Sequence, residues 1–213
     1  MNETDKAKFE EKTIAREEIF DGRIIHVVRD TVELPGGLGE QFRELAFHPG
    51  GASVIAITQE NKLVLVRQFR KPTERVIYEV PAGKIDPEER AKMQLSADNQ
   101  VISGFHSENG VTNPVLTAMM LRELEEETGY TTTDIRQVSE FYVSPGFCNE
   151  KHYVFLAKNL VKVPHPKAAD YGEVLELHEV MLEEAKALVR TGEIDDAKTL
   201  IALNFFEEEL AHG

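Results

Sequence analysis

The sequence predicts an α+β layered fold, with one main domain and a small N-terminal antiparallel β-sheet. The chain has 213 residues, of which 41% are hydrophobic, and this is enough for one globular core. Predicted strands and helices are mixed along the chain but do not alternate strictly, which favours layered α+β packing. His48-Pro49-Gly50-Gly51 breaks the pattern after the first strands. We therefore expect residues 1–48 to form the small sheet and residues 49–213 the main domain.

The expected strands are short, and most are bounded by turn residues. Three lie in the N-terminal part, at residues 12–20, 23–34 and 40–48, with Pro35-Gly36-Gly37 between the last two. In the main domain we expect strands at residues 52–58, 63–69, 75–80, 135–143, 151–157 and 174–180.

Three helices are expected in the main domain. Residues 117–128 contain no helix breaker, and Asn113-Pro114 can begin this helix because proline is favoured in a first turn. A second helix, residues 182–190, ends at Gly192, a common C-terminal cap. The third covers residues 196–211. It carries one apolar stripe, made of Leu200, Leu203, Phe206 and Leu210.

Residues 90–113, rich in turn-forming side chains, are expected to be an insertion on the surface of the main domain. Only Val101, Ile102 and Phe105 could anchor it to the core. Loop-closure entropy grows slowly with length, so such an insertion need not disturb the fold. Two interpretations remain open, a tolerated disordered loop and a lid over a substrate.

Composition excludes several classes of partner. The formal net charge of −14 argues against a nucleic-acid backbone or an anionic membrane as a partner, because both would be repelled. An anionic substrate would need a locally positive site or metal ions. A single cysteine, Cys148, excludes an internal disulfide framework and fits a reducing cytoplasm. No apolar signal segment precedes Glu11, and no apolar run approaches membrane-spanning length.

The expected helix at residues 117–128 carries Glu123, Glu126 and Glu127 at helical spacing. At about 100° per residue these carboxylates share one side of the helix, roughly 5–6 Å apart. Like charges this close repel one another unless a cation lies between them, and all-oxygen sites suit Mg²⁺ or Mn²⁺. The alternative is an ordinary solvated acidic helix face.

The residues before this helix favour the metal site. Gly83 is followed after five residues by Glu89, and the later run is Arg122-Glu-Leu-Glu-Glu-Glu-Thr-Gly-Tyr130. This pattern resembles the Nudix box, in which G, five residues, E and seven residues precede REUxEExGU, where U is bulky and apolar. The second half matches at every fixed position. The spacer from residue 90 to 121 has 32 residues, so 25 extra residues split the box.

Other motifs resemble the bacterial ADP-ribose pyrophosphatase branch of that family. They are Ile19-Phe20-Asp21-Gly22-Arg23, Arg43-Glu44, residues 66–72 and 79–84, Ser144-Pro145-Gly146-Phe147 and residues 195–199. The resemblance implies a Nudix α/β/α sandwich that cleaves the diphosphate of ADP-ribose to AMP and ribose 5-phosphate. Two alternatives remain. One is a Nudix hydrolase of another nucleotide sugar or of a dinucleotide polyphosphate, and the other is a non-catalytic ADP-ribose-binding sensor, which the intact glutamates disfavour.

The resemblance also implies a catalytic centre with two to three Mg²⁺ (or Mn²⁺) ions. Glu123 and Glu127 are the expected core ligands, and the Ala82 carbonyl completes the site. Glu126 is expected to bind metal or to hold a water on it, and Arg122 to orient the carboxylates. The resemblance places the general base in residues 167–174, with Glu173 as first choice and Asp170 as second; an ordinary loop carboxylate remains the alternative.

Substrate contacts follow from the same resemblance. Arg70 is expected at the diphosphate, and Arg43 and Glu44 near the adenine and ribose. Gly146 belongs to the Ser-Pro-Gly motif, which marks ADP-ribose specificity, and Glu150 is a possible contact to ribose or metal. Phe20 either stacks on adenine or packs as a strand aromatic. In this branch the N-terminal sheet is exchanged in a homodimer, so each active site takes residues from both subunits.

Overall fold

The computed structural model describes residues 7–95, 101, 103, 105, 112–168, 172 and 174–212. The chain divides into two compact units. The N-terminal unit comprises Met1–Gly50 and Tyr142–Lys151, and the main unit comprises Gly51–Phe141 and His152–Gly213. Among the described residues no helix is both long enough and apolar enough to span a bilayer.

The N-terminal unit is built on three antiparallel strands in the order β1-β2-β3. The strands are β1 (Lys12–Asp21), β2 (His26–Glu33) and β3 (Glu40–Phe47), with a 3-10 turn at Pro35–Gly37 between the last two. β2 begins later than predicted because residues 22–25 form a tight turn, in which Gly22 N donates to Ile25 O at 2.9 Å. The predicted small antiparallel sheet is therefore confirmed.

Burial in this sheet is confined largely to β2. Val28, Asp30 and Val32 are buried, whereas every residue of β1 is exposed. Arg16 donates to the two Asp30 carboxylate oxygens at 2.7 and 2.8 Å, and Thr13 adds a third hydrogen bond. The hydrogen bond from Arg16 is the main reason that the pKa of Asp30 lies below its usual value.

The main unit contains two larger sheets and a two-stranded one. The first has the order β7-β4-β10-β9, the second the order β12-β5-β6, and β11 pairs with β8. Their bounds are β4 (Gly51–Ala56), β5 (Leu63–Arg70), β6 (Arg75–Glu79), β7 (Ala82–Lys84), β8 (Tyr130–Thr131), β9 (Asp134–Tyr142), β10 (Lys151–Lys158), β11 (Val161–Lys162) and β12 (Glu176–Val180). β4 and β10 run parallel.

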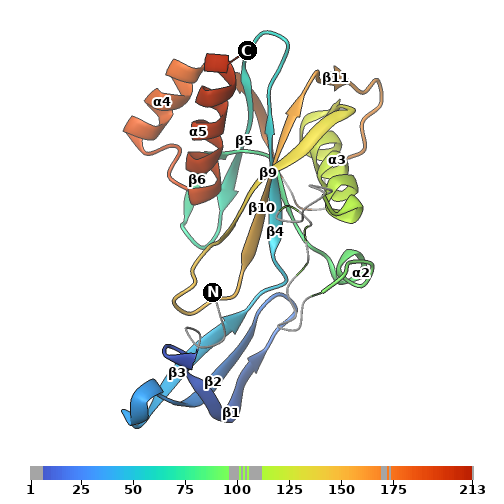
Figure 1. Ribbon diagram of the computed structural model, residues 1–213. Coiled ribbons are helices and arrows are strands. Elements are labelled where there is room, and N and C mark those ends of the chain that lie inside the picture. The colour runs from blue at the N-terminus through green and yellow to red at the C-terminus, as the bar shows by residue number, and fades with distance from the viewer. Residues whose placement is uncertain are drawn as a thin grey trace. The chain divides into compact units, whose positions relative to one another are not determined.

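Helices cover both faces of these strands (Figure 1). Tyr153 and Phe155 of β10 share a core with Met120 of α3 (Pro114–Thr128). Val154, the residue between them, points to the other face and packs in a second core with Phe206 of α5 (Ala197–His212). α4 (Leu182–Thr191) packs beside α5. The alternation along one strand produces the predicted α/β/α sandwich.

The ends of the predicted insertion are joined to the core. Met93 and Val101 are buried in the cluster on the α3 side, and Val101 O accepts a hydrogen bond from the Tyr153 hydroxyl at 3.0 Å. Val101 was one of the expected anchors and is confirmed as one, whereas the burial of Met93 was not predicted. Ile102, another expected anchor, lies outside the described residues. Helix α3 restarts as predicted, because Asn113 caps Val115 N at 2.9 Å and Pro114 is its first residue.

Candidate active site

The two halves of the split motif meet at the β7 strand and helix α3. Ala82 N donates a hydrogen bond to Glu127 Oε2 at 3.0 Å, although the residues are 45 positions apart. Gly83 lies so close to Glu123 that a Cβ atom at this position would collide with the carboxylate. A side chain at position 83 would therefore have to displace the Glu123 carboxylate, and the insertion does not separate the turn from the acidic helix.

Arg122 connects the carboxylates of this region. Its Nη1 lies 2.7 Å from Glu126, and its Nη2 lies 2.8 Å from Glu123 and 3.0 Å from Glu89. Glu89 comes from the short helix α2 (Pro87–Arg90), which begins with a capping box between Asp86 and Glu89. Burial alone would lower the pKa of Arg122, but the Glu123 charge and the other two carboxylates raise it above the ordinary value. Arg122 therefore remains charged and holds three carboxylates in place.

The chemistry of these residues fits a hard divalent cation. Glu123, Glu126 and Glu127 offer carboxylate oxygens, and Ala82 offers a carbonyl on the adjacent β7 strand. Gly83 lies against the Glu123 carboxylate and has no side chain of its own. An ion at this carboxylate would therefore not be blocked by residue 83. In the described part of the chain no three acidic, histidine or cysteine side chains converge as a ready ligand set. The carboxylates instead pair with Arg122 and the Ala82 amide.

Arg70, the residue expected at the diphosphate, is held at the end of β5. Its Nε donates to Glu79 Oε2 at 2.6 Å, and the Glu79 side chain is only 3% exposed. The Arg70 side chain is 40% exposed. Within the described part of the chain the Arg70 side chain donates through Nε, so Nη1 and Nη2 can serve an anionic ligand.

Three expected substrate residues lie on the strands of the N-terminal unit. Phe20 is 55% exposed, so within this unit it does not pack as a buried strand aromatic. Arg43 Nε donates to Glu11 at 2.7 Å, and Glu44 accepts from Arg29 at 3.3 Å. Both Arg43 and Glu44 are therefore in weak surface pairs that a ligand could replace.

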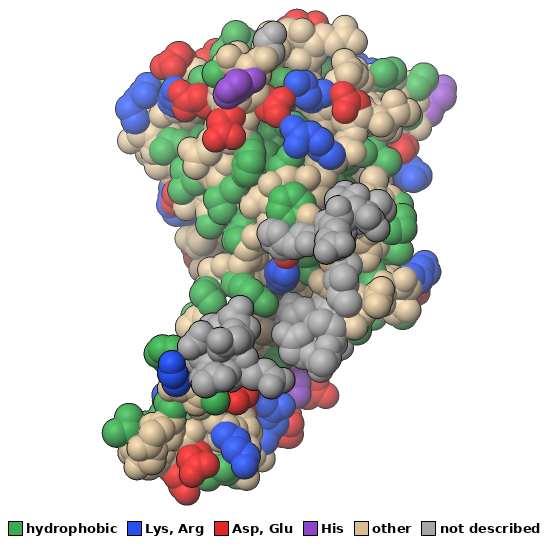
Figure 2. All heavy atoms as spheres, viewed as in Figure 1, with side chains coloured by type: hydrophobic (Ala, Val, Ile, Leu, Met, Phe, Trp, Pro, Cys, Tyr) green, Lys and Arg blue, Asp and Glu red, His purple; other side chains and the backbone are tan. Residues whose placement is uncertain are grey.

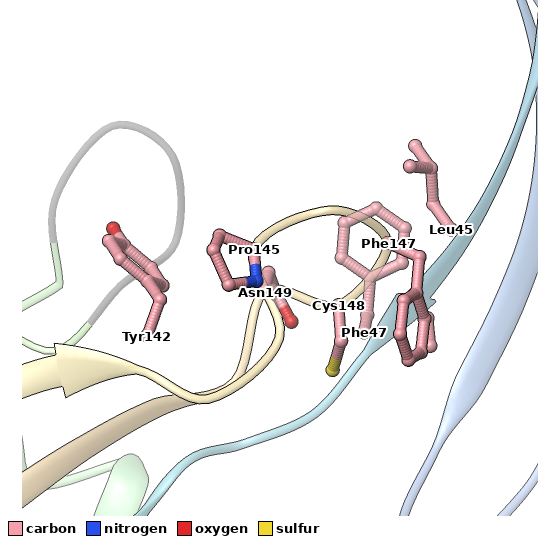
Figure 3. A pocket seen from close by; sticks show the side chains of 8 residues that line it. Leu45, Phe47, Tyr142, Pro145, Phe147, Cys148 and Asn149 are labelled. Carbon is pink, nitrogen blue, oxygen red and sulfur yellow. The ribbon is translucent and has the colours of Figure 1, made fainter.

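The Ser-Pro-Gly loop borders an apolar pocket of about 290 Å³ within the N-terminal unit (Figure 3). Its lining residues are Leu45, Ala46, Phe47, Tyr142, Pro145, Phe147, Cys148 and Asn149. Gly146 lies in the same loop, and Ala46 N donates to Phe147 O at 2.8 Å. Glu150 follows the loop, with Oε1 3.6 Å from Nδ1 of His48. The loop is thus held against β3.

The two candidate general bases are not described by the structure, and some polar residues near the site were not predicted. Glu173 and Asp170, the candidate general bases, lie outside the described residues. Glu79 and Thr199 are buried beside the turn that precedes β7, where Lys198 donates to Glu79 and Val80 N donates to Thr199. One feature of the sequence could have pointed to Lys198 and Thr199. Asp196 stands just before a helix, as is typical of an N-cap residue, and these two residues follow in the first turn.

Comparison with known proteins identifies the family. Residues 11–44 match a family described as the nucleoside diphosphate sugar hydrolase N-terminal domain. An ADP-ribose pyrophosphatase of Bacillus subtilis (strain 168) is 42% identical over 198 residues, covering 93% of each chain. The methanol dehydrogenase activator of Bacillus methanolicus is 40% identical over 206 residues, covering 96% of this chain and 97% of the relative.

A solved structure, described as an ADP compounds hydrolase, has the same fold. Its TM-score is 0.70 at 19% identity, and the match covers 96% of this chain and 95% of the other. The sequence relatives at 42% and 40% identity span nearly the whole chain. The chain therefore belongs to the Nudix hydrolases, in the branch of the bacterial ADP-ribose pyrophosphatases.

Proposed function

We propose that this protein is a metal-dependent hydrolase that cleaves the diphosphate of ADP-ribose to AMP and ribose 5-phosphate. The observation that carries the proposal is the reassembly of the split motif. Glu89 reaches Arg122, and Ala82 N reaches Glu127, across the inserted residues. A protein that only bound the nucleotide would not need this set of carboxylates.

The roles of the residues follow from their contacts and from the family. Bound Mg²⁺ or Mn²⁺, at two to three ions, would neutralise the diphosphate and acidify the attacking water. Glu123, Glu127 and the Ala82 carbonyl would hold the cations, with Glu126 as a further ligand or water-holding group. Arg122 keeps Glu123 and Glu126 oriented. Glu173, or else Asp170, would take the proton from water.

Arg70 is proposed to bind the diphosphate through its Nη groups, because its Nε already donates to Glu79. Phe20, Arg43 and Glu44 would contact the adenosine part, and Gly146 and Glu150 the ribose side. The exposure of Phe20 supports a stacking role.

We further propose a homodimer formed through the N-terminal sheet. The unit exposes large apolar side chains, among them Ile14, Ile19, Phe20 and Phe42. Figure 2 shows apolar side chains among charged ones on the surface of this unit. Monomeric proteins rarely leave large apolar patches in water, and a second copy of the sheet would cover them. The substrate residues of one subunit would then serve the metal centre of its partner.

Mixed dimers test this arrangement. Arg43→Ala and Glu127→Gln proteins, each weakly active or inactive alone, are unfolded together and refolded together. If the sheet serves the partner's site, each mixed dimer contains one fully intact site and activity returns. Activity that stays at the level of the separate variants would contradict the exchange, as would a monomer by sedimentation.

A small-molecule substrate fits the charge of the chain better than a macromolecular anion. The net charge of −14 opposes nucleic acids and anionic membranes, so neither is proposed as a partner. The single cysteine and a nucleotide substrate support action in the cytoplasm.

A substrate panel with Mg²⁺ tests the proposed reaction. ADP-ribose, GDP-mannose and diadenosine polyphosphates are compared, with products separated by ion-exchange chromatography. We expect the highest kcat/KM with ADP-ribose, and AMP and ribose 5-phosphate as products. Faster cleavage of another nucleotide sugar or of a dinucleotide would replace the substrate but keep the chemistry. ADP-ribose binding without turnover of any compound would support the sensor alternative.

A further inference from the structure

A chain of polar groups, of which Glu79 and Thr199 are buried, connects the start of α5 to the turn before β7. Glu79 ends β6 and directly precedes Val80-Pro81-Ala82. Its carboxylate is 3% exposed and accepts from two cations, Arg70 Nε at 2.6 Å and Lys198 Nζ. A buried carboxylate is stable only when it is paired, so Glu79 depends on both of them.

Lys198 is itself fixed by the first turn of α5. Its Nζ lies 2.8 Å from Asp196 Oδ1, and the same oxygen accepts from Thr199 N at 3.2 Å. An aspartate at this position satisfies an otherwise unpaired helix amide. The Lys198 side chain is only 14% exposed, so its ammonium group has little access to water and depends on these carboxylates.

Thr199 makes the second connection. Its side chain is fully buried, and Oγ1 accepts from Val80 N at 3.1 Å. The two residues after Val80 also make hydrogen bonds. Pro81 O accepts from Val54 N at 2.9 Å, and Ala82 N donates to Glu127. Pro81 has no N–H to bond. The position of the Ala82 carbonyl therefore depends on a threonine more than a hundred residues later in the chain.

We propose that Thr199 and Lys198 are positioning residues for the active site. Thr199 fixes the Val80–Ala82 turn against Glu127 and thereby sets divalent-cation affinity. Lys198 occupies one oxygen of Glu79, so that Arg70 pairs through Nε and keeps its Nη groups for the substrate diphosphate. Without Lys198, both Glu79 oxygens would draw Arg70 into a bidentate pair. The inference deepens the proposed function and rests on its metal and diphosphate sites.

Thr199 is tested by Mn²⁺ binding without substrate, using electron paramagnetic resonance of the free ion. Thr199→Val keeps the side-chain shape but removes the acceptor, whereas Thr199→Ser keeps the hydroxyl. We expect Thr199→Val to bind Mn²⁺ about 10-fold more weakly, as for other groups that orient metal ligands, and Thr199→Ser to bind like wild type. A Thr199→Val protein that is folded by circular dichroism, melts at a lower temperature and binds Mn²⁺ normally would reduce Thr199 to a purely structural residue.

Lys198 is tested by separating KM from kcat. We expect Lys198→Met to raise the KM for ADP-ribose about 10-fold, the size of one charged contact, with kcat and Mn²⁺ affinity close to wild type. Lys198→Arg should restore KM. Unchanged KM, or an equal loss in Lys198→Arg, would overturn this part. Because Mn²⁺ binding needs no substrate, a wild-type protein that binds Mn²⁺ but does not cleave ADP-ribose would count against the proposed function and not against Thr199.

Discussion

The two units of this chain bury their strands in opposite ways. All six residues of β4 in the main unit are buried, between the α3 core and the α5 core. All ten residues of β1 in the N-terminal unit are exposed. The main unit is therefore held by apolar packing of its own, whereas the N-terminal sheet relies on cross-strand pairs and leaves apolar side chains uncovered.

The difference matches the work proposed for each unit. Metal ligands must be held precisely. The proposed ligands lie on α3, whose Met120 and Leu124 are packed in the core, and on β7, where Ala82 N is hydrogen-bonded to Glu127. Recognition of the adenosine part needs exposed aromatic and charged groups, which the N-terminal strands provide. A sheet with this exposure is suited to being completed by a partner subunit.

The largest expected contrast is a pair of phenylalanine truncations. Phe155→Ala removes a fully buried ring from the main core and should lower the free energy of unfolding by about 3–5 kcal/mol. Phe42→Ala removes a ring that is 68% exposed, and should change it by less than about 0.5 kcal/mol in the isolated subunit. Denaturant unfolding at low protein concentration measures both. Equal losses would remove the contrast between the units.

A second pair compares arginines. Arg122→Met removes the partner of Glu89, Glu123 and Glu126, so kcat/KM should fall about 10- to 100-fold. Arg67→Met is the matched control, because Arg67 pairs at the surface with Glu176 and lies over Tyr78. Steady-state kinetics at saturating Mg²⁺ should show the control close to wild type. A similar loss in both variants would mean that Arg122 has no special role.

In the N-terminal unit the sensitive position is Asp30. Asp30→Asn weakens the pairing with Arg16 and should destabilise the sheet by about 1–3 kcal/mol near neutral pH. The folded-state pKa of Asp30 is lowered, so this contribution is present above the unfolded pKa of about 3.9 and is lost as pH falls through the folded pKa. Hydrogen exchange of β2 amides should therefore show a gap between wild type and variant that closes in acid. A gap that does not change with pH would contradict the assignment.

The smallest effect is expected at Tyr130 of the main unit. Its hydroxyl donates to Glu179 at 2.6 Å, so Tyr130→Phe should cost about 0.5–1.5 kcal/mol. Burial, and then Glu179, raise the pKa of Tyr130 to about 12. The stabilisation is thus complete below the unfolded pKa of about 10 and is lost as pH rises through about 12. Ultraviolet titration should lose one late tyrosine in Tyr130→Phe, and an unchanged titration curve in this variant would contradict the assignment.

The sequence predicted those parts of the fold whose signals are local and periodic. The spacing of Glu123, Glu126 and Glu127 defined the acidic helix, and Asn113-Pro114 marked its start. β7 and α2 were not predicted, because three- and four-residue elements carry too little periodicity. The roles of Thr199 and Lys198 were also not predicted, since their contacts with Val80 and Glu79 each cross 119 positions of sequence. The exposure of every β1 residue was not predicted either, because strand propensity indicates local conformation and not burial.

One measurement tests the central claim most directly, namely Mg²⁺-dependent release of AMP from ADP-ribose by wild type, Glu127→Gln and Glu125→Gln. Glu125 is a neighbouring carboxylate on the same helix that accepts from Lys167 N at 3.2 Å and has no part in the proposed site. We predict that Glu127→Gln abolishes AMP formation and that Glu125→Gln retains it. Equal activity in the two variants, or wild-type turnover that is insensitive to removal of Mg²⁺ by a chelator, would contradict the account.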